Sequence, residues 1–404
     1  MPDANILGIE SSCDETGAAV VGSGQQILSN VVASQIATHQ PYGGIVPELA
    51  SREHLRAMVP VVRQALADAG QSYESVDAIA VTQGPGLAGA LLVGISFAKA
   101  LSFALDKPLI AVNHLEGHVH AVLLEQRQTG NVDLQFPVLA LVVSGGHTHL
   151  YLAQAEENLW TYENIGHTRD DAAGEAFDKV AKLLGLGYPG GPIIDRLAPH
   201  GDPHAVKFQT AQIKHRDRND RQKEDRQRSE RQKRERSGLE ASPEEARPHF
   251  DFSYSGIKTA VLRYVETERM APTIEAHRQA LTELIGAKRQ PTLEDYLRLC
   301  DRQTLNLVAS FQRTMVTDLA TKTLAAAREY DVGTLFVSGG VAANQELRAT
   351  FHREAEIQGL PVFFPSRKLS TDNAAMIAAA AFPKFVRRQF VAMDFSAEAG
   401  MALG

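Results

Sequence analysis

Two histidines stand four residues apart in the segment NHLEGHVH, directly after an apolar run with the character of a strand. A helix is expected to begin there, and side chains at positions i and i+4 lie on one face of a helix. His114 and His118 could therefore share one metal ion. The alternative is that one histidine caps the helix while the other packs in the core. His120 would lie on another face and is the weaker ligand.

The glutamate of this segment argues against a metalloprotease. Proteases of the HExxH type place their general-base glutamate directly after the first histidine. Here Glu116 is the third residue of the motif, and one position turns a side chain by about 100° around a helix. A protease would therefore lack its base.

Three glycine-bearing turns follow strand-like runs, at residues 8–16 (GIESSCDET), 143–148 (VSGGHT) and 337–345 (VSGGVAANQ). Their backbone N–H groups, and the helix N-terminus after the last turn, suit a phosphate group. One such turn is usually structural, but three at strand ends in two halves of the chain suggest a nucleotide held between two lobes. Sugar kinases, actin and chaperone ATPases have that architecture.

Carboxylates accompany these turns. In the segment STDNAAM, Ser370 or Thr371 is expected to cap the last helix. Asp372 is then explained equally well as an acid that the helix dipole favours in the first turn. The acidic residues near the turns are Glu10, Asp14, Glu15, Asp170, Asp171, Asp178, Asp195 and Asp372.

The elements that must position these residues alternate between strands and helices. Apolar, β-rich runs predict strands at residues 5–9, 17–22, 77–82, 108–113, 137–143, 149–154 and 158–163. Helices are predicted at residues 47–69, after the loop 83–89, from about 171 to 184, and after the turn at 337–345. Such alternation argues for α/β layers, and the second strand-rich start suggests a second, related domain across a cleft. We expect lobes at residues 1–112 and 113–404, with the last helix, from about residue 371, packing back on the first lobe.

Composition limits the classes of function. The 404 residues are 44% hydrophobic, which supports a full core and two domains. The only cysteines, Cys13 and Cys300, exclude a disulfide framework and a cysteine-rich zinc site. We see no signal peptide and no run long enough to span a membrane, so the cytoplasm is the expected compartment. A net charge of −7 is unlike a protein that grips nucleic acid alone.

One segment differs in composition from the rest. Residues 214–236 hold no apolar residue, eleven Lys/Arg and six Asp/Glu, a net charge of 11 − 6 = +5. Such a stretch cannot bury enough surface to offset its ordering entropy. We expect a solvated, flexible insertion over residues 214–248, with a basic arm that contacts RNA phosphates as the sharper alternative.

The motifs together resemble one family. In order they are IESSCDET, GGIVPELASREH, QGPGLAGALLVG, NHLEGHVHA, VSGGHTHL, DDAAGEAFDKVAKLLGLGYPGGP, DFSYSGIKT, SGGVAANQELR and STDNAAMIA. From about Leu7 to Ala380 the chain closely resembles the bacterial tRNA N6-adenosine threonylcarbamoyltransferase family (TsaD), formerly described as a sialoglycoprotease. The charged insertion is the one clear departure from the family pattern.

The resemblance implies an α/β fold with two lobes, similar to the actin, chaperone-ATPase and sugar-kinase group (the ASKHA fold), with a cleft between duplicated domains. It also implies one divalent metal ion, usually iron and sometimes zinc, bound by His114, His118 and Asp372. The adenylate ligand of the family would contact Val142, Val143, Ser144, Gly145, Gly146, Asp178, Gly191, Asp195 and Asn344.

The activity implied is transfer of a threonylcarbamoyl group from threonylcarbamoyl-adenylate to a tRNA adenosine. The acceptor is the N6 amine of the adenosine 3′-adjacent to the anticodon (position 37), in tRNAs reading codons that begin with A, and AMP is released. That amine is a weak nucleophile, so a metal that polarises the carbonyl would help. Asp14 and Glu15, in the first cleft turn, are our candidates for the general base. The family also implies two partner proteins, a paralogous non-catalytic protein (TsaB-like) and a small P-loop ATPase (TsaE-like).

Two other interpretations share the glycine turns. An ATP-dependent kinase or chaperone-like ATPase of the same fold would prefer Mg²⁺ on oxygen ligands, so the histidine pair disfavours it. A nucleotide-binding scaffold in a multiprotein assembly would need the turns but not the histidines.

Overall fold

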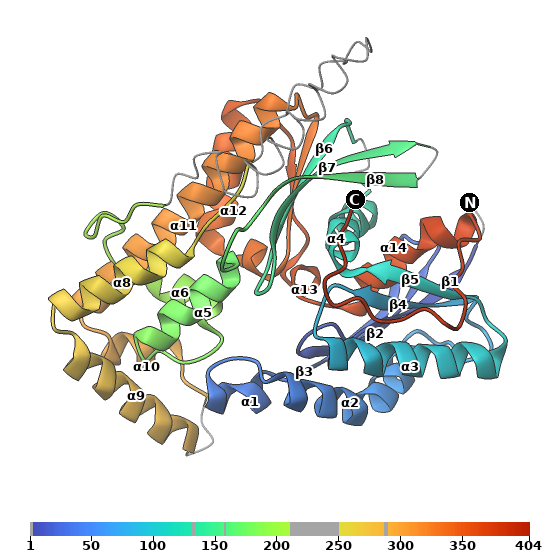
Figure 1. Ribbon diagram of the computed structural model, residues 1–404, viewed down its shortest axis with the longest axis horizontal. Helices are drawn as coiled ribbons and strands as arrows, with labels where there is room; N and C mark the ends of the chain where they lie inside the picture. Colours follow the sequence, from blue (N-terminus) through green and yellow to red (C-terminus); the bar gives the residue numbers. More distant parts are fainter. Residues whose placement is uncertain (1–2, 131–133, 157–158, 211–249, 287–289) are drawn as a thin grey trace, which may run out of the picture.

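The computed structural model describes residues 3–130, 134–156, 159–210, 250–286 and 290–404, which form two five-stranded sheets surrounded by helices (Figure 1). The first sheet has the order β3-β2-β1-β4-β5, with β1 at Asn5–Glu10, β2 at Glu15–Gly22, β3 at Gln26–Ser34, β4 at Ala78–Gly84 and β5 at Leu109–Asn113. The second has the order β10-β9-β6-β7-β8, with β6 at Val138–Val143, β7 at Thr148–Glu156, β8 at Leu159–His167, β9 at Thr334–Ser338 and β10 at Val362–Phe363.

The two sheets have the same topology. In each, three consecutive strands pair antiparallel, and the next two strands of the sheet join in parallel on the other side of the first strand. The predicted α/β fold with duplicated halves is therefore confirmed. The predicted insertion at 214–248 falls within 211–249, outside the described residues, and the lobe boundary at 112/113 stays a prediction.

Helices connect and cover the strands. The α-helices are α1 (Ile36–His39), α2 (Pro47–Asp68), α3 (Ala88–Leu105), α4 (His114–Gln128), α5 (Ala173–Leu183), α6 (Gly190–Leu197), α8 (Ser255–Thr267), α9 (Ala271–Gly286), α10 (Leu293–Leu299), α11 (Arg302–Glu329), α12 (Gln345–Ile357), α13 (Arg367–Ser370) and α14 (Ala374–Val386). Short 3₁₀ turns lie at Gln40–Tyr42, Ala198–His200 and Gly340–Ala343.

The first sheet is buried on both faces because side chains alternate along its strands. Leu7 and Ile9 of β1 pack with α2 and α3, whereas Ile6 packs with α14 on the opposite face. The second sheet alternates in the same way. Leu141 of β6 packs in a cluster with α5 and α11, and Val142 packs on the other face against α4.

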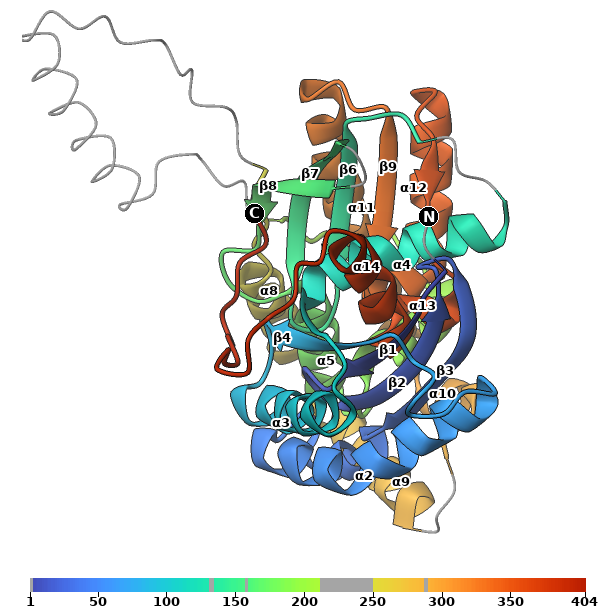
Figure 2. The ribbon, with the colours of Figure 1, turned by 90° about the vertical axis from the view of Figure 1, so that its right-hand side faces the viewer.

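Helices α4 and α14 lie between the two sheets (Figure 2). On α4, Leu115 and Val119 pack with the second sheet, while Ala121 and Leu124 belong to the cluster formed by α14 and the first sheet. Each of the two helices follows the last strand of one half. Helix α4 contacts both sheets, whereas α14 contacts the first sheet and α4.

Glycines let α14 approach its neighbours closely. A Cβ at Gly8 of β1 would lie 2.4 Å from the carbonyl oxygen of Ala374, and one at Gly117 of α4 would lie 2.9 Å from Cδ1 of Ile377. Real Cβ atoms do not tolerate the distance at Gly8, which is to a backbone atom, whereas at Gly117 the end of the Ile377 side chain would have to move. The small side chains of α14, which is mostly alanine, complete this close packing.

Helix α3 is long and apolar enough to cross a membrane by length and composition alone, so the expectation that no run reaches that length is wrong. The test is weak for a single helix, and a third of the 18-residue stretch is buried in the protein. Leu91, Ile95 and Ala98 of α3 pack against the first sheet, as the apolar face of a core helix does.

Candidate metal and nucleotide site

The histidine pair stands at the start of α4 because the strand β5 ends in a capping residue. The side-chain oxygen of Asn113 accepts hydrogen bonds from the backbone N–H groups of Leu115 and Glu116, at 2.9 and 3.4 Å. His114 and His118 then lie one turn apart and are both buried, with ring centroids 4.7 Å apart. The predicted position of the pair on one helical face is confirmed by this geometry.

Asp372 comes to this pair from the far end of the chain. Its Oδ1 lies 3.6 Å from Nε2 of His114 and 3.2 Å from Nε2 of His118. The three residues could hold one metal ion, since one ligand atom from each lies within 4.8 Å of the others. His₂Asp is a donor set that suits iron or zinc.

The predicted cap of the last helix is wrong. Asn373 is the N-cap of α14, and its side chain accepts from the backbone N–H of Met376 at 3.2 Å. Ser370 instead ends α13, and Thr371 follows it. Asp372 consequently lies before the cap and outside the first turn of α14, so the helix dipole alone does not account for its position.

Two observations test whether these residues fit a cation. Nε2 of His118 is buried and makes no hydrogen bond among the described residues, although Oδ1 of Asp372 is only 3.2 Å away. The two atoms face one another at that distance without hydrogen-bond geometry. Nε2 of His118 and Oδ1 of Asp372 could instead both bind a metal ion that lies between them, as two ligands of one ion do. The donor set therefore fits a divalent cation.

The charges of His114, His118 and Asp372 also fit a bound cation. Burial alone would lower the pKa of His114, but the carboxylates of Asp372 and Glu10 raise it to about 9. Burial lowers the pKa of His118. Burial would raise the pKa of Asp372, but His114 and His118 hold it well below its usual range. In the metal-free protein a proton on His114 balances the carboxylates, and a metal ion would take the place of that charge.

The remaining side chains of the NHLEGHVH segment point elsewhere. Glu116 forms an ion pair with Lys384 of α14, with Oε2 and Nζ 2.7 Å apart. A glutamate held in that pair does not serve as the base of a metalloprotease. His120 is buried beside Trp160, with ring centroids 5.7 Å apart, and lies outside the metal-binding trio.

Asp14 and Glu15, the predicted catalytic acids, lie in the turn between β1 and β2 and at the start of β2. Burial raises the pKa of both, and to about 8 for Glu15, with the charge of Asp372 adding to the effect. Oε1 of Glu15 accepts from Oγ of Ser34 at 2.8 Å, whereas its buried Oε2 has no hydrogen-bond partner among the described residues. Tyr188, from the second half, donates to Asp14 at 3.5 Å, so this turn faces the other lobe.

The VSGG turn lies next to the metal-binding trio. It connects β6 to β7, and its His147 has a ring centroid 5.9 Å from that of His114. Val142 and Val143 are buried in β6, and Ser144 closes the turn by donating its backbone N–H to the carbonyl of His147 at 2.8 Å.

Several glycines at the predicted adenylate site, and Gly340 in the nearby VSGGVAANQ turn, have no steric reason to be glycine. A Cβ added at Gly145, Gly146, Gly191 or Gly340 would meet nothing within 4 Å, and none of these residues has a positive φ. Gly339 differs, because its φ is 93° and a Cβ would lie 2.3 Å from the carbonyl of Val143. The open glycines form a surface that a ligand could approach to backbone distance.

The polar residues predicted to contact the adenylate are brought together around α6 and α12. Oδ1 of Asp178 accepts from the backbone N–H of Gly190 at 2.6 Å, which fixes the turn before Gly191. Oδ1 of Asp195 accepts from the backbone N–H of Gln345 at 3.0 Å. Next to it, Asn344 caps α12 through Leu347 and donates to Gln312 at 2.8 Å.

Sequence reasoning missed three residues of this site. Glu10 and Ser12 both reach Nδ1 of His114, and His147 lies against the ring of His114. Glu10 and His147 stood inside motifs that were recognised, but nothing in their spacing showed that they face the histidine pair. A buried strand ending in glutamate is a signal that could have found Glu10, since such a carboxylate requires a partner.

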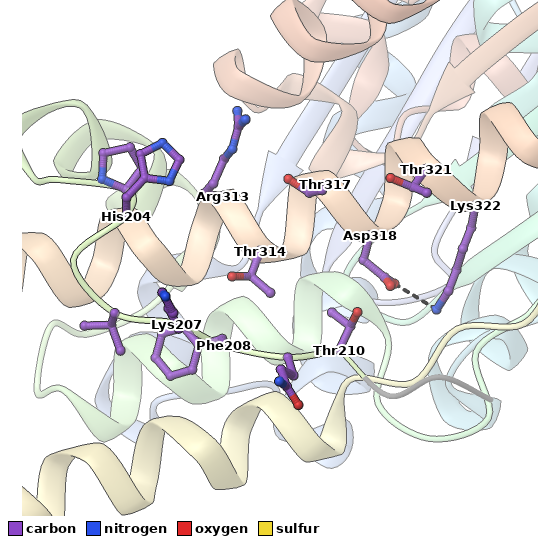
Figure 3. A pocket seen from close by; sticks show the side chains of 13 residues that line it. His204, Lys207, Phe208, Thr210, Arg313, Thr314, Thr317, Asp318, Thr321 and Lys322 are labelled. Carbon is purple, nitrogen blue, oxygen red and sulfur yellow. Dashed lines mark hydrogen bonds and ion pairs between the residues drawn. The ribbon is translucent and has the colours of Figure 1, made fainter. Parts of the chain in front are cut away.

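A groove of about 1010 Å³ lies away from this site, between residues 203–210 and α11 (Figure 3). Thr314, Thr317 and Thr321 of α11 line it, and Lys322 pairs with Asp318 at its edge, 3.0 Å apart. None of the predicted site residues borders it.

Comparison with known proteins gives a consistent result. The family described as tRNA N6-adenosine threonylcarbamoyltransferase (TsaD) matches residues 26–379. The chain is 66% identical over 403 residues to the protein of that name from Koribacter versatilis, covering 100% of both chains. It is 48% identical over 385 residues to the one from Syntrophobacter fumaroxidans, covering 95% of each.

Among solved structures, HypF from T. kodakarensis is similar in fold, with a TM-score of 0.50 and 13% identity over 96% of this chain and 49% of that chain. Full-length HypF in a phosphate- and nucleotide-bound form gives the same TM-score of 0.50, over 94% of this chain and 55% of that chain. At this identity the likeness concerns the fold alone. The sequence matches carry more, and on them the chain belongs to the tRNA N6-adenosine threonylcarbamoyltransferase family.

Proposed function

We propose that this chain transfers the threonylcarbamoyl group of threonylcarbamoyl-adenylate to the N6 amine of an adenosine in tRNA, with release of AMP. Membership of the family supports the reaction. The convergence of His114, His118 and Asp372 beside the VSGG turn is the observation that carries it, because an acyl transfer of this kind needs an electrophile activator next to the donor.

The metal is one divalent ion, and we propose iron, with zinc as the alternative. His114, His118 and Asp372 would hold it, and three protein ligands leave coordination positions open. When bound, the ion supplies Lewis acidity toward the carbonyl of the donor.

The adenylate is proposed to lie along the open glycines. Gly145, Gly146 and Gly191 present backbone that a phosphate or ribose can approach. The residues proposed to contact it are Val142, Val143, Ser144, Gly145, Gly146, Asp178, Gly191, Asp195 and Asn344. Holding the donor this way would fix its carbonyl in position for attack, which is a large part of the rate gain in acyl transfer.

Asp14 and Glu15 are the proposed bases for the amine proton. Their raised pKa values support this, because a base works best when its pKa is near the working pH. A cation at the trio would lower both pKa values, since positive charge favours the carboxylate. The unpartnered Oε2 of Glu15 leaves an acceptor free for a proton.

The tRNA target is proposed to be adenosine 37, in tRNAs that read codons beginning with A. A net charge of −7 does not favour tRNA binding by this chain alone. We therefore propose that a paralogous non-catalytic protein (TsaB-like) and a small P-loop ATPase (TsaE-like) act with it, in the cytoplasm.

Reconstitution tests the proposal. The chain, the two proposed partners and the enzyme that makes the adenylate would be incubated with tRNA, threonine, bicarbonate and ATP, and the nucleosides would be separated by mass spectrometry. We expect threonylcarbamoyladenosine at position 37, and its loss with Asp372→Ala while the adenylate still forms. Equal modification without this chain would refute the transfer, and the nucleotide-binding scaffold would then explain the glycine turns better.

A further inference from the structure

Glu10 is a fully buried carboxylate at the end of β1, and both of its oxygens accept hydrogen bonds. Oε1 accepts from the backbone N–H of Ser12 at 2.5 Å, and Oε2 accepts from Oγ1 of Thr82 at 2.6 Å. Oε2 also lies 3.2 Å from Nδ1 of His114. Burying a charged group costs free energy unless the group is paired and hydrogen-bonded. The partners of Glu10 therefore indicate its role.

The contact with Glu10 gives the two ring nitrogens of His114 different roles. Both oxygens of Glu10 already accept hydrogen bonds, from Ser12 and Thr82, and an N–H at Nδ1 of His114 that donates to Oε2 would complete this set. Nε2 is then the atom left for a ligand bond, and it is the atom that faces Oδ1 of Asp372, 3.6 Å away. Ser12 Oγ, at 3.2 Å from Nδ1, lies on the same side of the ring as Glu10.

The two histidines of the trio differ in this respect. Nδ1 of His118 is buried and has no hydrogen-bond partner among the residues that the structure describes. Behind its ring His118 therefore has no hydrogen-bond partner among these residues, whereas Nδ1 of His114 contacts a carboxylate from β1. Of the two histidines, only His114 is contacted behind its ring by a carboxylate, and that carboxylate lies at the end of β1.

We infer that Glu10 is a positioning residue of the metal site, which fixes the ring orientation and the Nδ1–H tautomer of His114 so that Nε2 binds the metal. This inference rests on the metal site of the proposed function. Histidine ligands usually donate their second ring N–H to a carboxylate or carbonyl, which orients the ring and raises its basicity. Glu10 stands where such a residue stands, one hydrogen bond behind a ligand.

A purely structural role for Glu10 is the alternative to be separated. Through Ser12 and Thr82 it also ties the turn after β1 to β4. Losing that tie would lower stability without touching the metal. Thr82→Val removes one hydrogen bond from Glu10 while leaving its contact with His114, so it serves as the matched control for that role.

The experiment measures metal binding rather than activity. Dissociation constants for Zn²⁺ and Co²⁺ would be obtained by chelator competition for the wild type, Glu10→Gln, Thr82→Val and Glu116→Gln. Glu116 is a second control, since it is a buried carboxylate on α4 that pairs with Lys384. We expect Glu10→Gln to weaken binding by about 10–100-fold, the range typical of such partners, and to shift the visible bands of the bound Co²⁺. Both controls should bind metal like the wild type.

A measurement on the wild type keeps the test independent of whether the variant folds. In the zinc-loaded protein, ¹⁵N spectra of His114 should show the proton on Nδ1 and the metal on Nε2. The opposite tautomer, or unchanged affinity and Co²⁺ spectrum in Glu10→Gln, would overturn the inference while leaving the metal site intact. A wild type that takes up neither metal would remove the metal site and this inference with it.

Discussion

Nε2 of His118 lies 3.2 Å from Oδ1 of Asp372, and this contact joins the N-terminal part of α4 to the loop before α14. Helix α4 packs on both sheets, whereas α14 packs on the first sheet and on α4. A site built at this position responds to the packing of both halves.

Removing one histidine should empty the metal site without unfolding the chain. In His118→Ala we expect metal affinity to fall by more than about 100-fold, because a ligand matters more than its hydrogen-bond partners, whose loss costs about 10–100-fold. Metal content after desalting measures this, with the melting temperature of the metal-free protein as the check on folding. His120→Ala is the matched control, a buried histidine on the same helix outside the trio, and it should keep its metal. Full occupancy in His118→Ala would contradict the assignment.

The open glycines allow a prediction in which stability and binding separate. Gly191→Ala should leave stability unchanged or raise it by up to about 1 kcal/mol, because a methyl group there meets nothing and alanine favours a helix. Adenine-nucleotide affinity, measured by calorimetry, should fall at the same time, since the methyl group would occupy the proposed ligand surface.

Gly286→Ala is the control for that variant, as a surface glycine at the end of α9 with equally open space. It should leave nucleotide affinity as it is. Wild-type affinity in Gly191→Ala would show that the ligand does not approach this turn.

Glu15 should make the metal-free protein less stable as the pH rises. Its pKa is raised from 4.5 to about 8 on folding, so between these values the unfolded chain loses the proton first. The unfolded state then binds fewer protons, and stability falls as pH increases through this window. Glu15→Gln removes the effect, and we expect it to be more stable than the wild type above pH 8, by on the order of 2 kcal/mol after allowance for partial exposure, with little difference near pH 4.

Denaturation midpoints across that pH range would measure the difference. Glu48→Gln, on the exposed face at the start of α2, is the control and should follow the wild-type profile. A constant gap between Glu15→Gln and the wild type at every pH would show that Glu15 does not titrate as described.

Deleting residues 214–236 should change the melting temperature by no more than about 2 °C, because the segment has no apolar residue to pack. The same deletion tests the basic arm. If the net +5 charge contacts RNA, tRNA affinity should fall and its dependence on salt should become shallower. A fall of many degrees would instead show that the segment packs on the core.

Much of this fold could be predicted from local patterns. β1, β4 and β6 are buried on both faces and appear in the sequence as short apolar runs, and α2 shows helical periodicity; both signals depend on neighbours along the chain. The pairing of His114 with His118 was predictable for the same reason, since one helical turn separates them. Asp372 was assigned by family resemblance, because no local pattern links it to α4.

What escaped prediction depends on contacts between distant segments. Asn373, not Ser370 or Thr371, caps α14, and the choice among adjacent capping residues is made by where α13 ends. Glu10 looked like one more turn acid until β1 was seen to end behind His114. Both outcomes depend on tertiary packing, which cannot be predicted from residue types and their spacing alone.

The close approach of α14 also sets limits on which variants the chain can tolerate. Gly117 lies between the two histidines on α4, and its missing side chain leaves room for Ile377; Gly8 does the same for the carbonyl of Ala374, two residues beyond Asp372. A methyl group at Gly8 would press β1 and the start of α14 apart, because the atoms in its way are backbone atoms. At Gly117 the nearest atom is the end of the Ile377 side chain, which can move, so the effect there should be smaller. A substitution at Gly8 touches no ligand, yet it would show itself as a loss of metal, and in a mutational survey this glycine would score with the active site although it has no side chain to contribute to it.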